Sequence, residues 1–393
     1  MKIVVAHFQA VTGISGGMER VLCDFSNAMI EFGHEVHLMV YDLQSGIPFY
    51  PLHDGVHLWN LRKFSGEPNK IPAGKKVGRE IARFIGGEPR VCSWYDHYRA
   101  PYLLPAAKKL LNEIKPDIIV VQWYTSNYLV KLLKPSCPIV TWFHNRPTRL
   151  FRNMSREQKK AIGESALIQV LTPDYQKEMH RTYPQAKIIC IPNEVPQLEE
   201  QADLKQEKDR FHIITVGRLN KVTKRQHILI DAFSKVAEEF PNWDLEIWGK
   251  GDSNYVKYLR NQIQQKRLEK RVFLRGVTTN ILNENLHSDI FAFPSDHEGF
   301  PLAMTEAMSV GLPVVAFASC SGVNEIVKNG ETGFLVSDGV DDFAQKLKLL
   351  MENHELRIKM GNAAKQDMKQ YAPEKIWRQW ESALLQCVNK GKK

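Results

Sequence analysis

Two glutamates stand eight positions apart in the stretch EGFPLAMTE, residues 298–306, which follows the apolar run IFAF at 290–293. The run predicts a buried strand, and Pro301 suits the first turn of a following helix because its missing N–H costs nothing there. We therefore expect Glu298 at the mouth of the helix and Glu306 facing outward about two turns along. A helix N-terminus attracts anions, and carboxylates accept hydrogen bonds from hydroxyl groups. The stretch predicts a site for a polyol next to a phosphate.

Basic residues that could hold such a phosphate occur in VGRLNKVTK, residues 216–224. Arg218 is expected at the end of a strand, and Lys224 at the start of the helix that follows it. The planar fork of arginine and the point charge of lysine together suit a diphosphate. The alternative is that both are surface residues capping a strand–helix loop.

Three more candidates follow predicted strands in this half of the chain. Gly249 and Gly251 in WGKGD let the backbone approach a ligand, or simply make a turn. Val277 ends the segment RGV, where backbone groups could meet the edge of a nucleobase. Each of these signals is weak in isolation.

Candidates in the first half of the chain are Gly16 and Gly17, which precede a helix expected at 21–31, and His144 at the end of the strand in TWFHN. The glycines do not form the G-x-G-x-x-G dinucleotide pattern, so hydride chemistry is poorly supported. They could leave a helix N-terminus open to an anion. A single histidine is more often structural than catalytic. No Asp-x-Asp occurs in the chain, which argues against a metal-dependent nucleotide-sugar site.

The segments that must position these residues alternate between short apolar strands and helical patterns in both halves of the chain. Apolar strands of this kind are buried on both faces of parallel sheets, so the fold class is α/β with two Rossmann-like domains. We expect domains at 1–195 and 196–370, an insertion at about 62–100, and a C-terminal helix at 371–393 that returns to the first domain. Ligands of such sheets bind at the carboxyl ends of the strands, here in a cleft between the domains.

Composition narrows the function. The chain has 393 residues and a net charge of +9, and residues 1–195 carry 25 basic and 17 acidic side chains. A basic first half suggests an anionic partner, although a solvated lysine-rich face is the alternative. The chain shows no apolar run of the roughly 18 residues that a membrane span needs. Its six cysteines lack metal-ligand spacing, which favours reduced thiols in the cytoplasm.

A basic amphipathic helix is expected in AGKKVGREIARFIGG, residues 73–87. Its pattern suits the surface of an anionic membrane, unless the apolar face packs on the first domain. Its apolar side chains are Val77, Ile81, Phe84 and Ile85, and its basic ones are Lys75, Lys76, Arg79 and Arg83. Arg146, Arg149 and Arg152 recur every third residue after His144 and could bind the phosphate of a lipid-linked acceptor.

The run from VGRLNKVTK through EGFPLAMTEAMSVGLPVVA to NGETGFLV resembles the donor-binding domain of the family 4 glycosyltransferases. The first half of the chain resembles the family at four segments in their expected positions: SGGMER, TWFHN, LTPDY and IPNEV. The resemblance therefore covers nearly the whole chain outside 62–100. It implies the GT-B fold, with two parallel sheets facing across a cleft, and retaining transfer from a nucleotide-sugar. One departure is that Arg218 and Lys224 are six positions apart, where five is usual.

The resemblance implies a role for each site residue. Glu298 would contact the hydroxyls of the donor sugar, and Glu306 those of the ribose. Arg218 and Lys224 would neutralise the diphosphate in place of a metal ion, and His144 would contact the sugar or the acceptor. The expected catalytic residues are His144, Arg218, Lys224 and Glu298. The expected donor-binding residues are Gly16, Gly17, Arg218, Lys224, Gly249, Gly251, Val277, Glu298, Gly299, Phe300, Leu302 and Glu306.

The resulting hypothesis is transfer of a hexose or N-acetylhexosamine, with a UDP-sugar favoured, to a glycan or lipid-linked acceptor in bacterial surface polysaccharide or glycolipid synthesis. Neither a cofactor, a metal nor nucleic acid is expected, and the location is cytoplasmic, with the inner face of the cell membrane possible. The alternatives are a nucleotide-sugar epimerase of the same fold and a GDP-mannose-dependent mannosyltransferase. Two further alternatives are a glycoside hydrolase, which would not need Arg218 and Lys224, and a non-catalytic protein that binds a sugar nucleotide.

Overall fold

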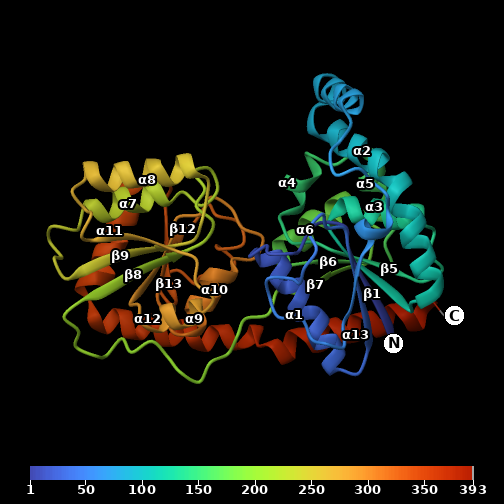
Figure 1. The fold of residues 1–393 in the computed structure, drawn as a ribbon. Helices are drawn as coiled ribbons and strands as arrows, with labels where there is room; N and C mark the ends of the chain where they lie inside the picture. Colours follow the sequence, from blue (N-terminus) through green and yellow to red (C-terminus); the bar gives the residue numbers. More distant parts are fainter. Residues whose placement is uncertain (392–393) are drawn as a thin grey trace. The chain divides into compact units, whose positions relative to one another are not determined.

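The computed structural model describes residues 1–391, and the chain forms two compact units. One unit comprises residues 1–193 together with the chain from Ile376 onward, and the other comprises residues 194–375. The divisions therefore fall at 193/194 and 375/376, against the predicted 195/196 and 370/371. Each unit is built around one parallel β-sheet flanked by helices (Figure 1).

The first unit contains a seven-stranded sheet in the order β3-β2-β1-β4-β5-β6-β7. Its strands are β1 (Lys2–His7), β2 (Glu35–Val40), β3 (His57–Asn60), β4 (Ile118–Gln122), β5 (Ile139–Trp142), β6 (Leu167–Val170) and β7 (Ile188–Cys190). Neighbouring strands of this sheet pair in parallel, and β1, β4, β5 and β6 are almost wholly buried. This burial explains why these four strands read as continuous apolar runs.

Helices of the first unit connect these strands. They are α1 (Gly17–Glu31), the short 3₁₀ helix η1 (Leu61–Phe64), α2 (Ala73–Ile114), α3 (Tyr124–Leu132), α4 (Pro147–Phe151), α5 (Arg156–Gly163), α6 (Pro173–Thr182) and α13 (Pro373–Gly391). Helix α1 starts four residues before the predicted Val21. The prediction was wrong because the N-cap is Gly16, which has no side chain to accept a hydrogen bond from the first turn, so no Ser, Thr, Asp or Asn marks the start of the helix in the sequence.

Helix α2 is two helices joined at a kink. Gly86 has φ −152° and ψ 18°, and Gly87 has φ 61°, so neither is helical. The second segment, from Glu88 to Ile114, packs Leu103, Ala107, Leu110 and Ile114 into the core on the sheet. The predicted insertion at 62–100 therefore ends inside a helix whose remaining turns belong to the core.

Helix α13 packs on the first unit through two tryptophans. Trp380 is buried, and its ring centroid lies 5.3 Å from that of Phe25 and 4.9 Å from that of Trp142. Trp377 lies 6.0 Å from Phe25. Large aromatic side chains dominate core energetics, so this cluster fixes the last helix on the unit that begins the chain.

The second unit contains a six-stranded parallel sheet in the order β10-β9-β8-β11-β12-β13. Its strands are β8 (Phe211–Val216), β9 (Trp243–Trp248), β10 (Val272–Gly276), β11 (Ile290–Phe293), β12 (Val314–Phe317) and β13 (Gly333–Val336). Its helices are α7 (Gln226–Ser234), α8 (Ser253–Gln265), α9 (Ile281–Leu286), α10 (Leu302–Ser309), α11 (Val340–Glu352), α12 (His354–Met368) and the 3₁₀ helix η2 (Lys369–Tyr371).

Both sheets reverse their strand order at one point. In the first unit the reversal lies between β1 and β4, and in the second between β8 and β11. The loops that leave the two strands on either side of a reversal turn away from each other, which opens a crevice at the carboxyl ends. The two reversal points are therefore where the fold places ligand-binding residues.

Candidate functional site

Predicted donor-site residues lie at the carboxyl edge of the second sheet. Arg218 follows β8, Gly249 follows β9, Val277 follows β10 and Glu298 follows β11 by five residues. Arg218 and Val277 are exposed, as is Gly251. Because parallel strands end at the same edge, residues separated by up to 80 positions in sequence come to one edge of this sheet.

Lys224 and Glu298 form an ion pair across the reversal point of this sheet. The Lys224 Nζ lies 2.5 Å from the Glu298 Oε1, and both side chains are mostly buried. The same ammonium lies 5.1 Å from the centre of the Phe293 ring, which adds a cation–π contact. The extra residue in the loop after β8 therefore does not keep Lys224 from the segment that carries Glu298.

Arg225 is a basic residue of this loop that the sequence prediction missed. It adopts a left-handed backbone with φ 48°, and its guanidinium donates to the carbonyls of Pro294 (3.1 Å) and Ser295 (3.2 Å). A backbone bond from Asp296 N–H to the Thr223 carbonyl, 2.8 Å, joins the same two loops. Arg225 therefore holds the loop after β11 in place and so positions Lys224 and Glu298. The sequence alone does not show that Arg225 and Lys224 have different roles, because they are adjacent residues of equal charge.

The prediction that Glu306 faces outward is wrong. Glu306 is 3% exposed, and α10 is buried from Met304 to its end at Ser309. The helix packs against α12 and β11, so none of its residues from Met304 to Ser309 faces solvent. A carboxylate buried to this depth needs polar partners, and Glu306 has them.

The start of α10 also differs from the prediction. Gly299 and Phe300 are buried, and the Phe300 ring packs edge-on against Tyr371 at 5.5 Å. The backbone N–H of Leu302, one of the expected donor-binding residues, donates to the Phe300 carbonyl at 2.9 Å. Pro301 precedes the first helical residue, as the N-cap rather than the first turn.

The glycines at 249 and 251 allow two strand ends to approach closely. A Cβ added at Gly249 would overlap the Gly217 carbonyl, and one at Gly251 would overlap the Leu219 carbonyl. Backbone bonds from Gly217 N–H to Trp248 (3.0 Å) and from Leu219 N–H to Lys250 (2.9 Å) hold the ends of β8 and β9 together beyond the strands. Packing alone thus explains why glycine stands at both positions.

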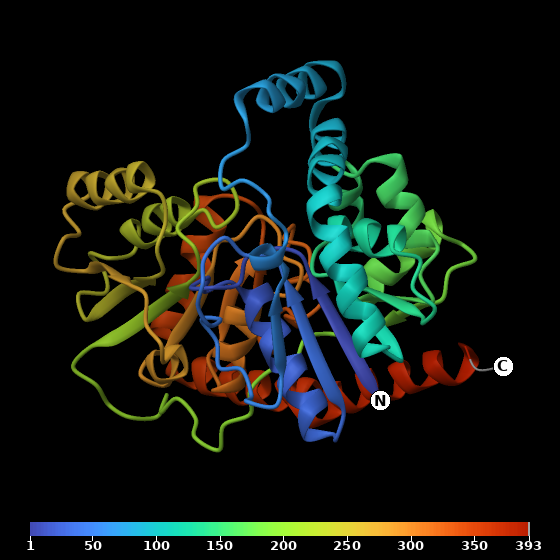
Figure 2. The ribbon, with the colours of Figure 1, turned by 45° about the vertical axis from the view of Figure 1, so that its right-hand side comes forward.

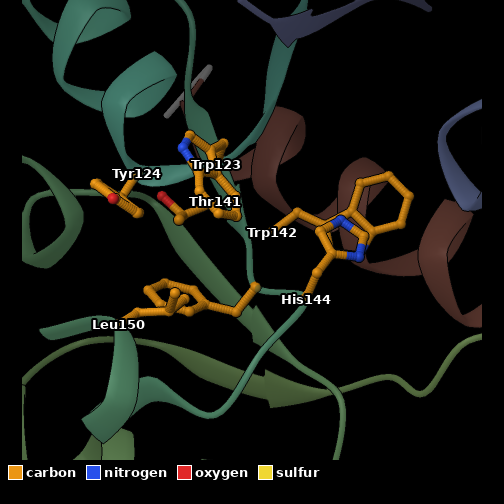
Figure 3. A pocket seen from close by; sticks show the side chains of 7 residues that line it. Trp123, Tyr124, Thr141, Trp142, His144 and Leu150 are labelled. Carbon is orange, nitrogen blue, oxygen red and sulfur yellow. The ribbon is translucent and has the colours of Figure 1, made fainter. Parts of the chain in front are cut away.

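His144 lies at the carboxyl edge of the first sheet. Its imidazole packs on Trp142, with 4.7 Å between ring centroids (Figure 3). The Nε2 atom is buried and makes no hydrogen bond within residues 1–391. Burial, together with nearby His7, lowers the pKa of His144 to about 3. The ring is therefore neutral at physiological pH.

His7 is a second histidine at this edge of the sheet, and the sequence prediction missed it. It ends β1 and is 0% exposed, and neither ring nitrogen has a hydrogen bond that meets normal geometry among the described residues. Burial lowers the pKa of His7 to about 4, while the side chain of Gln122 acts in the opposite direction. Gln122 ends β4, so His7 and Gln122 occupy the two sides of the reversal point. The sequence signal that could have identified His7 is a polar residue at the end of an apolar run.

Trp123 carries backbone strain at the same edge. It follows β4 with φ 82° and ψ 135°, a conformation that residues other than glycine rarely adopt. Its ring stacks on Tyr124 at 5.0 Å, and both line a small hollow with Thr141, Leu150 and His144 (Figure 3). Strained residues cluster at functional sites, so Trp123 joins His144 and His7 as a candidate site residue.

The remaining predicted residues of the first unit lie apart from this hollow's lining. Gly16 caps α1 and Gly17 begins it, and the carboxylate of Glu19 packs against Gly16, which places negative charge where an anion was expected. Arg146 pairs with Glu178 at 2.6 Å. Arg149 and Arg152 are exposed on and just after α4.

Neither a metal cluster nor a membrane span was found in the described part of the chain. Among residues 1–391, no group of three or more His, Cys, Asp or Glu side chains is arranged to hold a metal ion. Within the same residues, each helix is too short or too polar to cross a bilayer.

Family comparisons agree with this geometry. The family described as "Glycosyltransferase Family 4" matches residues 15–196, and "Glycosyl transferases group 1" matches residues 196–367. An uncharacterized glycosyltransferase of Haemophilus influenzae is 25% identical over 382 residues, spanning 95% of this chain and 97% of its own. The Campylobacter jejuni N-acetylgalactosamine-N,N'-diacetylbacillosaminyl-diphospho-undecaprenol 4-alpha-N-acetylgalactosaminyltransferase is 32% identical over 179 residues, 45% of this chain and 47% of that protein.

Solved structures share the fold over the full length. HepE of Anabaena in complex with UDP-glucose has a TM-score of 0.72 and 20% identity, covering 98% of this chain and 100% of that one. The pneumococcal O-GlcNAc transferase GtfA, in complex with UDP and GlcNAc, has a TM-score of 0.77 and 13% identity, covering 99% of each chain. The chain belongs to the family 4 glycosyltransferases and has the GT-B fold, as the sequence motifs predicted.

The close approach of the backbone at Gly249 predicts that a side chain there would clash, and this clash can be measured separately from the cost of a positive φ angle. Gly249 and Gly339 have nearly equal φ angles, 142° and 141°, but a Cβ at Gly339 would meet nothing within 4 Å. Gly249→Ala should therefore lower the free energy of unfolding by about 1–3 kcal/mol more than Gly339→Ala does, from overpacking alone. Chemical denaturation of both variants measures the difference. Equal losses would show that the strand ends relax freely.

Burial of His7 predicts a dependence of stability on pH. Its pKa in the folded chain, about 4, lies below the roughly 6.5 of a free imidazole, so the unfolded chain takes up a proton first as the pH falls. The free energy of unfolding should then fall below pH 6.5 by at most about 1.4 kcal/mol per pH unit for this residue, until the pH reaches its folded pKa.

His7→Gln should remove that part of the slope between neutral pH and about pH 5 in chemical denaturation series. Replacing the exposed His287 by glutamine is the matched control. A His7→Gln slope identical to that of the wild type would contradict the assignment.

Proposed function

We propose that the protein is a retaining glycosyltransferase that moves a hexose or N-acetylhexosamine from a UDP-sugar to a glycan or lipid-linked acceptor. The setting we propose is bacterial surface polysaccharide or glycolipid synthesis, in the cytoplasm and at the inner face of the membrane. The observation that carries the proposal is the Lys224–Glu298 pair, which stands at the reversal point of the second sheet, followed by buried Glu306.

Donor binding would begin with an exchange of partners at this pair. A diphosphate arriving near exposed Arg218 would attract Lys224, whose ammonium is now bound to Glu298. Once Lys224 moves to the phosphate, the Glu298 carboxylate can accept hydrogen bonds from sugar hydroxyls. Glu306 would accept the ribose hydroxyls, and the two cations would stabilise the departing diphosphate without a metal ion.

A uridine nucleotide is favoured because two structures of this fold contain one: HepE is in complex with UDP-glucose, and GtfA with UDP and GlcNAc. A lipid-linked acceptor is favoured because the Campylobacter relative is named for a diphospho-undecaprenol substrate. The basic first half of the chain would suit the phosphates of such an acceptor.

Retention would not need a carboxylate nucleophile. The leaving phosphate would take the proton of the acceptor hydroxyl, on the face of the sugar from which it departs. His144 is too weak a base for that role, because a useful general base has a pKa near the working pH and burial lowers that of His144 to about 3. As a neutral imidazole it would donate one hydrogen bond to the sugar or to the acceptor.

The proposed division of roles between the two glutamates is testable by calorimetry. Glu306→Gln should weaken UDP binding by roughly 1.5–3 kcal/mol, about 10- to 150-fold, since the ribose loses a charged acceptor. Glu298→Gln should bind UDP at least as tightly as the wild type, because Lys224 no longer has a carboxylate partner, yet it should lose sugar transfer. If both variants weaken UDP equally, the assignment fails. Circular dichroism spectra showing that both variants are folded at the temperature of the titration are the control.

The identity of the donor is testable by thermal shift. With UDP, GDP, ADP and dTDP at equal concentration, UDP should raise the unfolding temperature most, since a ligand at 100 times its Kd stabilises the native state by about 2.7 kcal/mol. The shift should be the same with a chelator as with Mg²⁺, and it should disappear in Lys224→Ala. A larger shift with GDP would favour a mannosyltransferase, and a shift that requires Mg²⁺ would contradict metal-free binding.

A further inference from the structure

The first segment of α2, from Ala73 to Ile85, presents its large apolar side chains to solvent. Val77 is 60% exposed, Ile81 53%, Phe84 94% and Ile85 61%. Their spacing of four, three and one places all four on one side of a helix. The alternative expectation, that this face packs on the first domain, is wrong.

The opposite side of this segment packs on the rest of the unit through small residues. A Cβ added to Gly78 would lie 3.3 Å from the Trp94 Nε1, and Arg79 donates to the Tyr95 hydroxyl at 3.2 Å. Ala82, one turn after Gly78, is also partly buried. Amphipathic helices of globular proteins normally turn their large apolar residues inward. Here the inward side is small, and the large apolar side has no cover within the described chain.

Positive charge surrounds the exposed apolar side. Residues 73–90 carry five basic and two acidic side chains, a net charge of +3. Lys75, Lys76 and Arg83 are exposed, and the nearby carboxylate of Glu80 pairs with Arg79 and Arg83. An apolar stripe flanked by lysine and arginine complements an anionic lipid surface, where the cations meet phosphates and the apolar side chains enter the headgroup boundary.

The position of the segment leaves this side accessible. It lies at the far end of the second segment of α2, away from the sheet, in both views of the first unit (Figures 1 and 2). Gly86 and Gly87 join the two segments with non-helical backbone, so the first segment has its own direction.

We propose that residues 73–85 form a docking helix that binds the surface of a bilayer containing anionic lipids. The apolar side chains Val77, Ile81, Phe84 and Ile85 enter the boundary between headgroups and acyl chains, while Lys75, Lys76 and Arg83 contact lipid phosphates. This proposal adds to the proposed function the surface that binds the membrane and the charge of the lipid. It rests on the proposed function in one respect: docking would give the enzyme access to a lipid-linked acceptor.

Sedimentation with vesicles tests the proposal on the full chain. The wild type should sediment with vesicles of phosphatidylcholine and phosphatidylglycerol and should remain in solution with phosphatidylcholine alone. The triple variant Lys75→Glu, Lys76→Glu, Arg83→Glu should bind the anionic vesicles at least about tenfold more weakly. Its matched control reverses three exposed basic residues of the second unit, Lys257, Arg260 and Lys270, with the same change in net charge, and should bind as the wild type does.

A second variant separates insertion from charge. Ile81→Ser with Phe84→Ser keeps the net charge and should also bind at least about tenfold more weakly, because burial of apolar area drives insertion. Vesicle binding that ignores lipid charge, or that survives in either variant, would overturn the proposal. So would a wild-type dimer that the serine variant converts to a monomer in light scattering, because a second copy would then cover this face.

Transfer to a water-soluble acceptor keeps the two proposals distinguishable. Loss of vesicle binding in the triple variant with full transfer to the soluble acceptor supports docking and leaves the enzyme intact. Vesicle binding by a wild-type protein that transfers no sugar would count against the proposed function alone.

Discussion

The ion pair between Lys224 and Glu298 sets the requirements that the rest of the second unit meets. Two mostly buried charges 2.5 Å apart are stable only if the loops that carry them stay in register. The loop after β11 is held by Arg225 through two carbonyls and by the bond from Asp296 to Thr223. The glycines at 249 and 251 bring the end of β9 against the start of the loop after β8, which carries Lys224 and Arg225. The strand order, the loop contacts and the positions of the glycines thus together hold Lys224 and Glu298 in contact.

The two units differ in the chemistry of their reversal points. The second offers opposite charges that cancel each other, whereas the first offers neutral groups: His7, His144 and Gln122, with strained Trp123 beside them. Neutral buried donors and acceptors discriminate between hydroxyl patterns without attracting every anion, because an unmatched polar group there costs free energy.

Sequence patterns predicted most of the fold because strands buried in parallel sheets are rich in apolar residues. Strands β4 (IIVVQ), β11 (IFAF) and β12 (VVAF) are nearly continuous apolar runs, and β2 (EVHLMV) and β9 (WDLEIW) alternate apolar with polar residues. Strands β3 and β7 were missed because β3 (HLWN) is partly exposed at the sheet edge and β7 has three residues. Motif spacing predicted that Lys224 and Glu298 belong to one site, but not that they contact each other. The depth of Glu306 and the roles of Arg225 and His7 follow from tertiary packing, which the local sequence does not encode.

Helix α13 ties the last part of the chain to the unit that is synthesised first. The core around Phe25 and Trp142 receives Trp377 and Trp380 only after the whole second unit has left the ribosome. Until then, buried faces of both aromatic residues are uncovered, and the nascent first unit has an incomplete core. Folding of this unit is therefore completed only after the second unit has been synthesised. A fragment ending at residue 193 would keep every strand of the first sheet and still lack part of its own interior.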